Sequence, residues 1–149
     1  MSRILILVNH APTLCHFRTE LVEALLAEGH EVIISCPHDP RLDRVRDMGC
    51  RLEDISISRH GTNPFRELKL LSDYGRLVKK TAPDVVFSYT IKPNIYGAMI
   101  CREHRIPLVA NITGMGRALE EPGWLRAIAV GMYKHAFRQV HKVFFQNAD

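Results

Sequence analysis

Several common signatures are missing from this chain of 149 residues, and each absence removes a class of protein. The four cysteines show no CxxC motif and no other zinc-ligand spacing, which argues against a structural zinc site. Neither a GxxxxGKS/T phosphate loop nor a GxSxG turn is present, so P-loop chemistry and serine hydrolysis have no support. No apolar run approaches the roughly 20 residues that span a bilayer.

The overall composition is that of an ordinary soluble globular domain. Apolar residues make up 46% of the chain and charged residues 24%, and no linker, repeat or low-complexity stretch is visible. The net charge of +4 favours anionic partners but is far from a histone-like balance, so we expect no nucleic-acid partner. Three of the cysteines fall in apolar contexts, which is typical of reduced thiols in a cytosolic protein.

Short apolar runs alternate with amphipathic segments along the whole chain. Strands are predicted at 4–8, 32–34, 51–57, 85–88, 107–112 and 143–146, and helices through 17–25, 41–48, 64–80, 93–105 and 122–141. Gly29 and Gly49 close two of the helices, and Asn63-Pro64 opens another. This alternation predicts an α/β fold with a doubly wound, mainly parallel sheet of about six strands and helices on both faces, which is a Rossmann-like arrangement.

Ligands of open parallel sheets bind outside the carboxyl ends of the strands, so the residues that follow each strand are the candidates for a site. They form a polar rim at 9–13, 36–38, 58–60, 89–92 and 113–117. The first of these turns contains no glycine, which argues against the dinucleotide-binding fingerprint, and the Gly114-x-Gly116 fragment follows the wrong strand.

A metal site is one interpretation of the histidines and cysteines near the first two strand ends. These residues suit zinc or copper, but their spacing follows no known ligand pattern, so histidines that hydrogen-bond substrate or water are the better interpretation. The residues concerned are His10, Cys15, His16, Cys36 and His38. No metal is therefore predicted.

The stretch SYTIKPNIYG has two interpretations. Lys92, next to Pro93 at the predicted helix start, forms an anion site with the free N–H groups there, while Tyr89 and Thr90 orient sugar hydroxyls. Alternatively, Lys92 is simply solvated and Tyr89 packs under the next loop. Gly97 is expected to allow close packing of the helix on the sheet.

Four segments in this order resemble the N-terminal domain of family 4-like glycosyltransferases of the GT-B fold: FRTELVEALLAEGHEV, APDVVFSYTIKPNIYGAM, NITGMG and KVFFQNAD. The resemblance covers essentially the whole chain and is strongest to the bacterial branch that builds capsule, O-antigen and lipid-linked oligosaccharides. YTIKPNIYG is its most specific part.

The resemblance implies that residues 1–149 form one acceptor-side domain and that a second, donor-binding domain is absent. The full-length enzyme would transfer a hexose or derivative from a nucleoside-diphosphate sugar, without a further cofactor, to an acceptor that is often polyprenyl-diphosphate-linked. That second domain supplies an E-x7-E pair in the family. Glu20 with Glu28, and Glu23 with Glu31, match the spacing here, but they lie on or just beyond the first predicted helix and we interpret them as part of a solvated face.

The resemblance also implies a set of substrate-binding residues. The first turn would border the donor diphosphate or the acceptor, the fourth-strand turn would line the cleft, and two glycines would let backbone N–H groups approach the reacting sugar. The residues are His10, Thr13, His16, Phe17, Arg18, Tyr89, Thr90, Lys92, Asn94, Thr113, Gly114 and Gly116. The family often has glycines in the first turn, where this chain has HAPTLCHF, and the resemblance names no general base.

The predicted helix at 122–141 is both aromatic and basic. Trp124, Arg126, Lys134 and Arg138 suit a peripheral contact with anionic lipid, on the inner face of the plasma membrane in a cytoplasmic protein. We favour the alternative, in which the apolar stripe packs on the sheet and the charges face water. Two other functions stay open: a nucleotide- or dinucleotide-binding protein of Rossmann or flavodoxin type, and a membrane-recruiting subunit of a two-chain glycosyltransferase.

Overall fold

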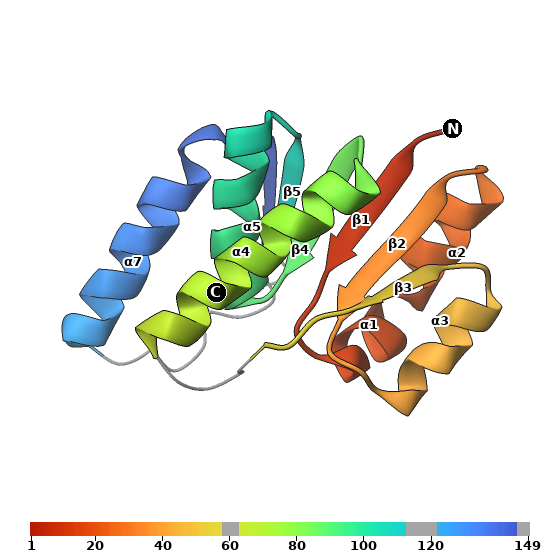
Figure 1. The fold of residues 1–149 in the computed structure, drawn as a ribbon, viewed down its shortest axis with the longest axis horizontal. Coiled ribbons are helices and arrows are strands. Elements are labelled where there is room, and N and C mark those ends of the chain that lie inside the picture. The colour runs from red at the N-terminus through yellow and green to blue at the C-terminus, as the bar shows by residue number, and fades with distance from the viewer. Residues whose placement is uncertain (58–62, 113–121, 146–149) are drawn as a thin grey trace.

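Six parallel strands form a single sheet in the computed structural model, which describes residues 1–57, 63–112 and 122–145 (Figure 1). The strand order is β3-β2-β1-β4-β5-β6, and each neighbouring pair is parallel. The strands are β1 (Arg3–Leu7), β2 (Glu31–Cys36), β3 (Arg51–Asp54), β4 (Val85–Tyr89), β5 (Leu108–Ile112) and β6 (Lys142–Phe145). The predicted α/β fold with a parallel sheet of about six strands is confirmed.

Helices cover both faces of this sheet (Figure 1). One face carries α1 (Ala11–Phe17), α2 (Thr19–Ala27), the 3-10 turn η1 (Pro40–Leu42) and α3 (Asp43–Asp47). The other carries α4 (Pro64–Thr81), α5 (Ile91–His104), α7 (Trp124–Ala136) and the 3-10 turn η2 (Phe137–Gln139). In the described ranges, no helix combines the length and the hydropathy needed to cross a membrane.

β1 lies between β2 and β4 and is buried on both faces. Successive side chains of a strand point to opposite faces, so Ile4 and Ile6 pack with α1, α2 and α3, whereas Leu5 and Leu7 pack with α4 and α5. Each of these four side chains is at most 4% exposed. The double burial explains the continuous apolar run in the sequence.

Helix ends follow the local signals read from the sequence. Gly29 and Gly49 have φ angles of 85° and 115°, which glycine adopts without steric cost. The Asn63 side chain accepts a hydrogen bond from the Phe65 N–H at 3.0 Å and caps α4 as predicted. A Cβ atom at Gly97 would lie 2.8 Å from Leu7 Cδ1, which confirms that α5 packs closely on the sheet here.

Several boundaries differ from the prediction. The helix expected at 17–25 is α2, which begins at Thr19, and the turn expected before it is a separate helix, α1; the two are divided at Arg18, whose backbone leaves the helical region at φ −129°. α5 begins at Ile91 and not near Pro93, because the chain already turns at Thr90. The third strand ends at Asp54 and not at residue 57, and the helix expected at 122–141 ends at Ala136 and continues as η2.

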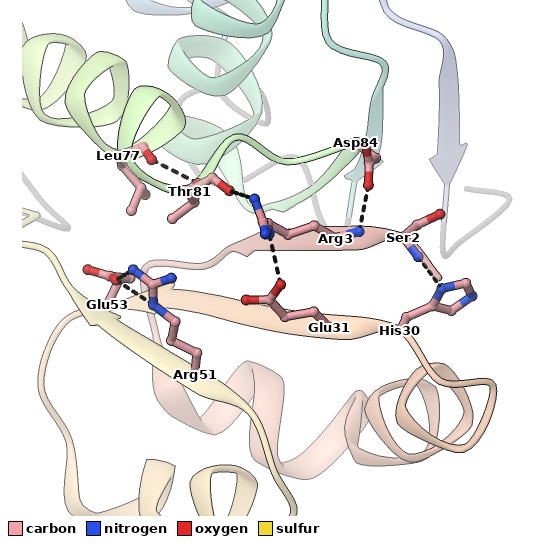
Figure 2. A network of polar contacts seen from close by, with 9 residues as sticks. All are labelled: Ser2, Arg3, His30, Glu31, Arg51, Glu53, Leu77, Thr81 and Asp84. Carbon is pink, nitrogen blue, oxygen red and sulfur yellow. Dashed lines mark hydrogen bonds and ion pairs between the residues drawn. The ribbon is translucent and has the colours of Figure 1, made fainter.

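Polar contacts join the starts of three strands (Figure 2). Arg3 Nε lies 2.8 Å from Glu31 Oε2, and Arg3 Nη1 donates to the Thr81 carbonyl at 2.9 Å. The backbone N–H of Arg3 donates to Asp84 Oδ2 at 2.7 Å. These residues stand at or just before the first residues of β1, β2 and β4, and we call this end of the sheet the amino edge.

Candidate functional site

The turns after β1 and β4 meet at the opposite end of the sheet, which we call the carboxyl edge because the parallel strands finish there. Thr90 follows β4, and its hydroxyl donates to Asn9 Oδ1 at 2.8 Å. Asn9 lies two residues beyond the end of β1, and 81 residues separate the two partners in sequence. The fold therefore brings together two of the turns that were predicted to contribute to one site.

Thr90 has an unusual backbone conformation. Its φ and ψ angles are 71° and 169°, a region that β-branched residues avoid because of steric conflict. Such a conformation costs about 1–3 kcal/mol and persists only where neighbours hold it. The side-chain bond to Asn9 and a backbone bond from Asn94 N–H to the Thr90 carbonyl, at 3.0 Å, do so here. Strained residues of this kind concentrate at binding and active sites.

The predicted residues of the first turn belong to α1 and its end. His10 precedes the helix, and its Nδ1 lies 3.3 Å from Thr13 Oγ1. His16 and Phe17 are exposed at the other end of α1, with their rings in an edge contact. The Arg18 guanidinium lies over the Tyr89 ring, 5.0 Å from its centroid, and links this region to β4.

Tyr89 and Asn94 lie beneath the carboxyl edge, where they are 2% and 0% exposed. Burial raises the pKa of Tyr89. Asn94 Oδ1 accepts from Ser88 Oγ at 2.7 Å, and its Nδ2 donates to the Asn111 carbonyl at 3.0 Å. These bonds hold β4, α5 and β5 together. Both side chains are enclosed in the described structure. Direct contact of either side chain with a substrate stays a prediction.

Lys92 forms an ion pair with Glu67 of α4. The Nζ to Oε1 distance is 2.6 Å, and the two side chains are 15% and 18% exposed. Lys92 is therefore partly buried and is not a simply solvated lysine. Tyr96 hydrogen-bonds the same carboxylate, and burial together with this bond raises the pKa of Tyr96. Glu67 thus connects α4 to two successive turns of α5.

A polar cavity of about 430 Å³ opens beside this ion pair. It lies where β3 ends and where α4 and α5 begin, so it belongs to the carboxyl edge. Its lining consists of Ser56, Ile57, Arg66, Glu67, Lys69, Leu70 and Lys92. Three of these residues are cationic and one is acidic, which suits an anionic group with several oxygen atoms.

Arg66, Glu67 and Lys69 were not among the residues predicted from the sequence. They lie in the first turns of a charged helix and look like solvated positions in the sequence. A usable signal did exist, because helices that follow parallel strands begin at the carboxyl edge. The first turn of the helix after the cap at Asn63 could therefore have been predicted to lie at the carboxyl edge, close to the site.

Three predicted site residues, Thr113, Gly114 and Gly116, fall outside the described residues. Within the described part of the chain, no group of three or more histidine, cysteine or acidic side chains is placed to share a metal ion. The Cys36 and Cys50 thiols are unpaired and buried, and burial raises their pKa values to about 12 and about 11. Neither thiol is thus a nucleophile at neutral pH.

Residues 3–147 match the family described as glycosyl transferase 4-like, and the chain belongs to this family. A curated relative from Campylobacter jejuni (subsp. jejuni serotype O:2) is N,N'-diacetylbacillosaminyl-diphospho-undecaprenol alpha-1,3-N-acetylgalactosaminyltransferase. It is 27% identical over 150 residues. The match takes in 97% of this chain and 40% of that enzyme, so this chain spans well under half the length of the relative.

Solved structures share the fold at low sequence identity. MurG from Acinetobacter baumannii superposes with a TM-score of 0.66 at 15% identity, over 97% of this chain and 41% of MurG. The UDP-GlcNAc 2-epimerase from Methanocaldococcus jannaschii superposes with a TM-score of 0.61 at 14% identity, over 97% and 39% of the two chains. At this identity the likeness establishes the Rossmann-like half of a GT-B architecture and does not establish the chemistry.

Proposed function

We propose that this chain is the acceptor-binding N-terminal domain of a nucleotide-sugar-dependent glycosyltransferase. The observation that carries the proposal is the family match across residues 3–147. The reaction moves a hexose or hexose derivative onto a lipid-linked glycan in surface polysaccharide synthesis. A separate donor-binding domain would hold most of the nucleotide sugar, in agreement with the short span of this chain relative to the enzyme from C. jejuni.

The acceptor class follows from the name of that relative, which acts on an undecaprenol-diphosphate-linked sugar. Such an acceptor presents a diphosphate and sugar hydroxyls. The carboxyl edge offers matching groups, namely the cations of the polar cavity and the hydroxyl and amide of Thr90 and Asn9. Both halves of the acceptor head therefore have partners of suitable chemistry on adjacent turns.

In the proposed reaction, an acceptor hydroxyl oxygen forms a bond to the anomeric carbon while the bond from that carbon to the nucleoside diphosphate breaks, and the hydroxyl proton passes to the departing diphosphate. Negative charge then grows on the leaving diphosphate, and positive groups near it lower the barrier. In this chain the residues of the carboxyl edge orient the acceptor, so that its hydroxyl meets the donor across the cleft. We assign no general base to this domain.

The proposed location is the cytoplasmic side of the plasma membrane, with peripheral attachment. Trp124 is 70% exposed at the start of α7, and Arg126, Lys134 and Arg138 of the same segment are exposed cations. An aromatic ring beside cations is the usual chemistry of an interfacial contact. Met132 and Phe137 instead pack against the core, so only part of α7 is available for lipid.

The test is a transfer assay with the intact protein that contains this chain. Radiolabelled nucleotide sugars are supplied with a polyprenyl-diphosphate-linked saccharide, and the label is followed into the lipid phase. Transfer of label to the lipid supports the proposal. Label that stays in water-soluble nucleotide sugar contradicts it, and conversion to an isomeric nucleotide sugar would indicate an epimerase of the same fold.

A further inference from the structure

Two cavities of opposite character adjoin at Glu67. The polar cavity described above lies on one side of this residue. On the other side a groove of about 460 Å³ runs between α4, α5 and α7, and we call it the apolar groove. Its main lining residues are Leu68, Leu71, Met99, Ile128 and Met132. The Glu67 carboxylate forms an ion pair with Lys92, which lines the polar cavity, and a hydrogen bond with Tyr96, which lines the apolar groove. Glu67 therefore marks the boundary between the two cavities.

The polar cavity carries a surplus of positive charge. Lys92 neutralises Glu67, which leaves Arg66 and Lys69. Lys69 also pairs with Asp73 at 2.9 Å, and Asp73 lies within reach of Arg76 as well, so one carboxylate is shared by two cations. The first turn of α4 adds the partial positive charge of a helix N-terminus. Together these groups favour a diphosphate over a neutral sugar.

The apolar groove exposes side chains that a closed core would cover. Leu68 of α4 is 64% exposed and Ile128 of α7 is 50% exposed, and both line the groove. The three helices lie on one face of the sheet (Figure 1). The groove falls within the usual size of small-molecule sites, about 300–1,000 Å³.

We propose that the two cavities together bind one amphiphilic molecule, a polyprenyl diphosphate that carries the acceptor sugar. The diphosphate occupies the polar cavity, and the first isoprene units lie in the apolar groove. This inference rests on the proposed function and adds where each part of the acceptor binds. Because Lys92 is two residues from Thr90, a sugar attached to the diphosphate would lie at the turns after β1 and β4.

The position of the charged groups favours a single bound molecule over a flat bilayer. Lys92 and Glu67 are at most 18% exposed and lie below the surface that a flat bilayer would contact, although Arg66 and Lys69 at the rim of the polar cavity are exposed. The apolar groove and the polar cavity also adjoin end to end at Glu67, just as the apolar tail and the charged head of one lipid molecule are joined.

The first experiment measures binding of farnesyl diphosphate, a soluble prenyl diphosphate, to the full chain by calorimetry. Two control ligands are measured in the same way: inorganic diphosphate, which represents the charged head group alone, and farnesol, which represents the prenyl tail alone. We expect farnesyl diphosphate to bind at least about tenfold more tightly than either part. Trp124 is the single tryptophan of the chain and stands one turn before Ile128, so its emission should shift to the blue.

Variants separate the two halves of the site. Arg66→Gln with Lys69→Gln should weaken farnesyl diphosphate about tenfold and leave farnesol unchanged. Ile128→Gln should weaken farnesyl diphosphate and leave inorganic diphosphate unchanged. The matched controls are Arg44→Gln on α3 and Phe144→Gln on β6, both exposed positions away from the cavities, and neither should alter binding.

Equal affinity for farnesyl diphosphate and inorganic diphosphate would overturn the inference. Binding that follows phosphatidylglycerol vesicles and ignores the prenyl diphosphate would do the same, because it would make the groove a membrane patch. A different outcome would contradict the proposed function: farnesyl diphosphate binds as described, but the intact protein transfers no sugar. If the cavity variants transfer sugar with an unchanged KM for the lipid-linked acceptor, this inference is wrong and the proposed function stands.

Discussion

The two edges of the same sheet use their polar residues in different ways. At the amino edge, Arg3 reaches β2, α4 and, through its backbone, Asp84, so its polar groups hold strands together (Figure 2). At the carboxyl edge, Thr90 keeps a strained backbone, and cations surround an open cavity. The difference agrees with the proposed function, in which the first edge holds the fold together and the second binds substrate, because backbone strain and open charge persist where function requires them.

The largest expected effect is on activity at the carboxyl edge. Lys92→Ala in the intact protein should reduce kcat/KM for transfer by about 100-fold, as removal of a charge-stabilising donor does in other enzymes. The matched control is Arg3→Gln at the amino edge, which should lower the melting temperature and leave kcat/KM unchanged. Equal activity of wild type and Lys92→Ala would remove this lysine from the site.

The Lys92 variant needs a second comparison, because it leaves the Glu67 carboxylate without its cationic partner. The double variant Glu67→Gln with Lys92→Gln removes both charges, keeps the length of the Glu67 side chain and shortens the Lys92 side chain by one atom. We expect it to recover the melting temperature but not the activity. Recovery of both would mean that Lys92 acts only by supporting the fold.

The next effect is on stability beneath the carboxyl edge. Asn94→Ala should lower the free energy of unfolding by about 2–4 kcal/mol, because the Ser88 hydroxyl and the Asn111 carbonyl lose their partner in a buried place. Asn63→Ala is the control at an exposed cap and should cost about 1 kcal/mol. Urea denaturation of both variants makes the comparison, and similar losses would show that the buried network is dispensable.

A smaller effect isolates the strain at Thr90. Thr90→Val and Thr90→Gly both remove the hydroxyl that donates to Asn9, but only glycine adopts a φ of 71° freely. The glycine variant should therefore be more stable than the valine variant by about 1–2 kcal/mol. Thermal unfolding measures the difference, and a more stable valine variant would show that the backbone is unstrained.

The smallest effect concerns pH and the ion pairs of Glu53 with Lys80 and with Arg51, the second of which is drawn in Figure 2. Burial alone would raise its pKa, but hydrogen bonds from Lys80 and Arg51 outweigh burial, so the pKa is lowered from 4.5. A lowered folded-state pKa gives stability that is present above about pH 4.5 and lost as the pH falls. Glu53→Gln should make the fall in the free energy of unfolding between pH 6 and pH 3 smaller. Glu20→Gln on α2 is the exposed control, and an unchanged slope for Glu53→Gln would refute the assignment.

Periodicity and caps were sufficient to predict the fold. The run Ile4–Val8 identified the central strand, and Gly29, Gly49 and Asn63 marked helix ends where the structure has them. The helix α1 was not predicted, because the residues that follow the first strand were interpreted as a polar turn. The early start of α5 depends on a threonine with positive φ, which the sequence does not reveal.

The candidate site was only partly predictable. The turn at Tyr89 to Lys92 stood out because it follows a buried strand and carries polar side chains. Its main partner, Glu67, is 25 residues away on another helix, and no local pattern connects them. Such pairs form only when the fold places two helix starts side by side, so sequence reasoning found Lys92 and missed the cavity around it.

Hydrogen exchange on the intact protein tests the central claim most directly. The polyprenyl-diphosphate-linked acceptor and the nucleotide sugar are added separately, and amide protection is mapped along this chain. The account predicts that the acceptor alone protects residues 64–70 and 90–96, and that the amino edge is unchanged. Protection of those segments by the nucleotide sugar and not by the acceptor would contradict it.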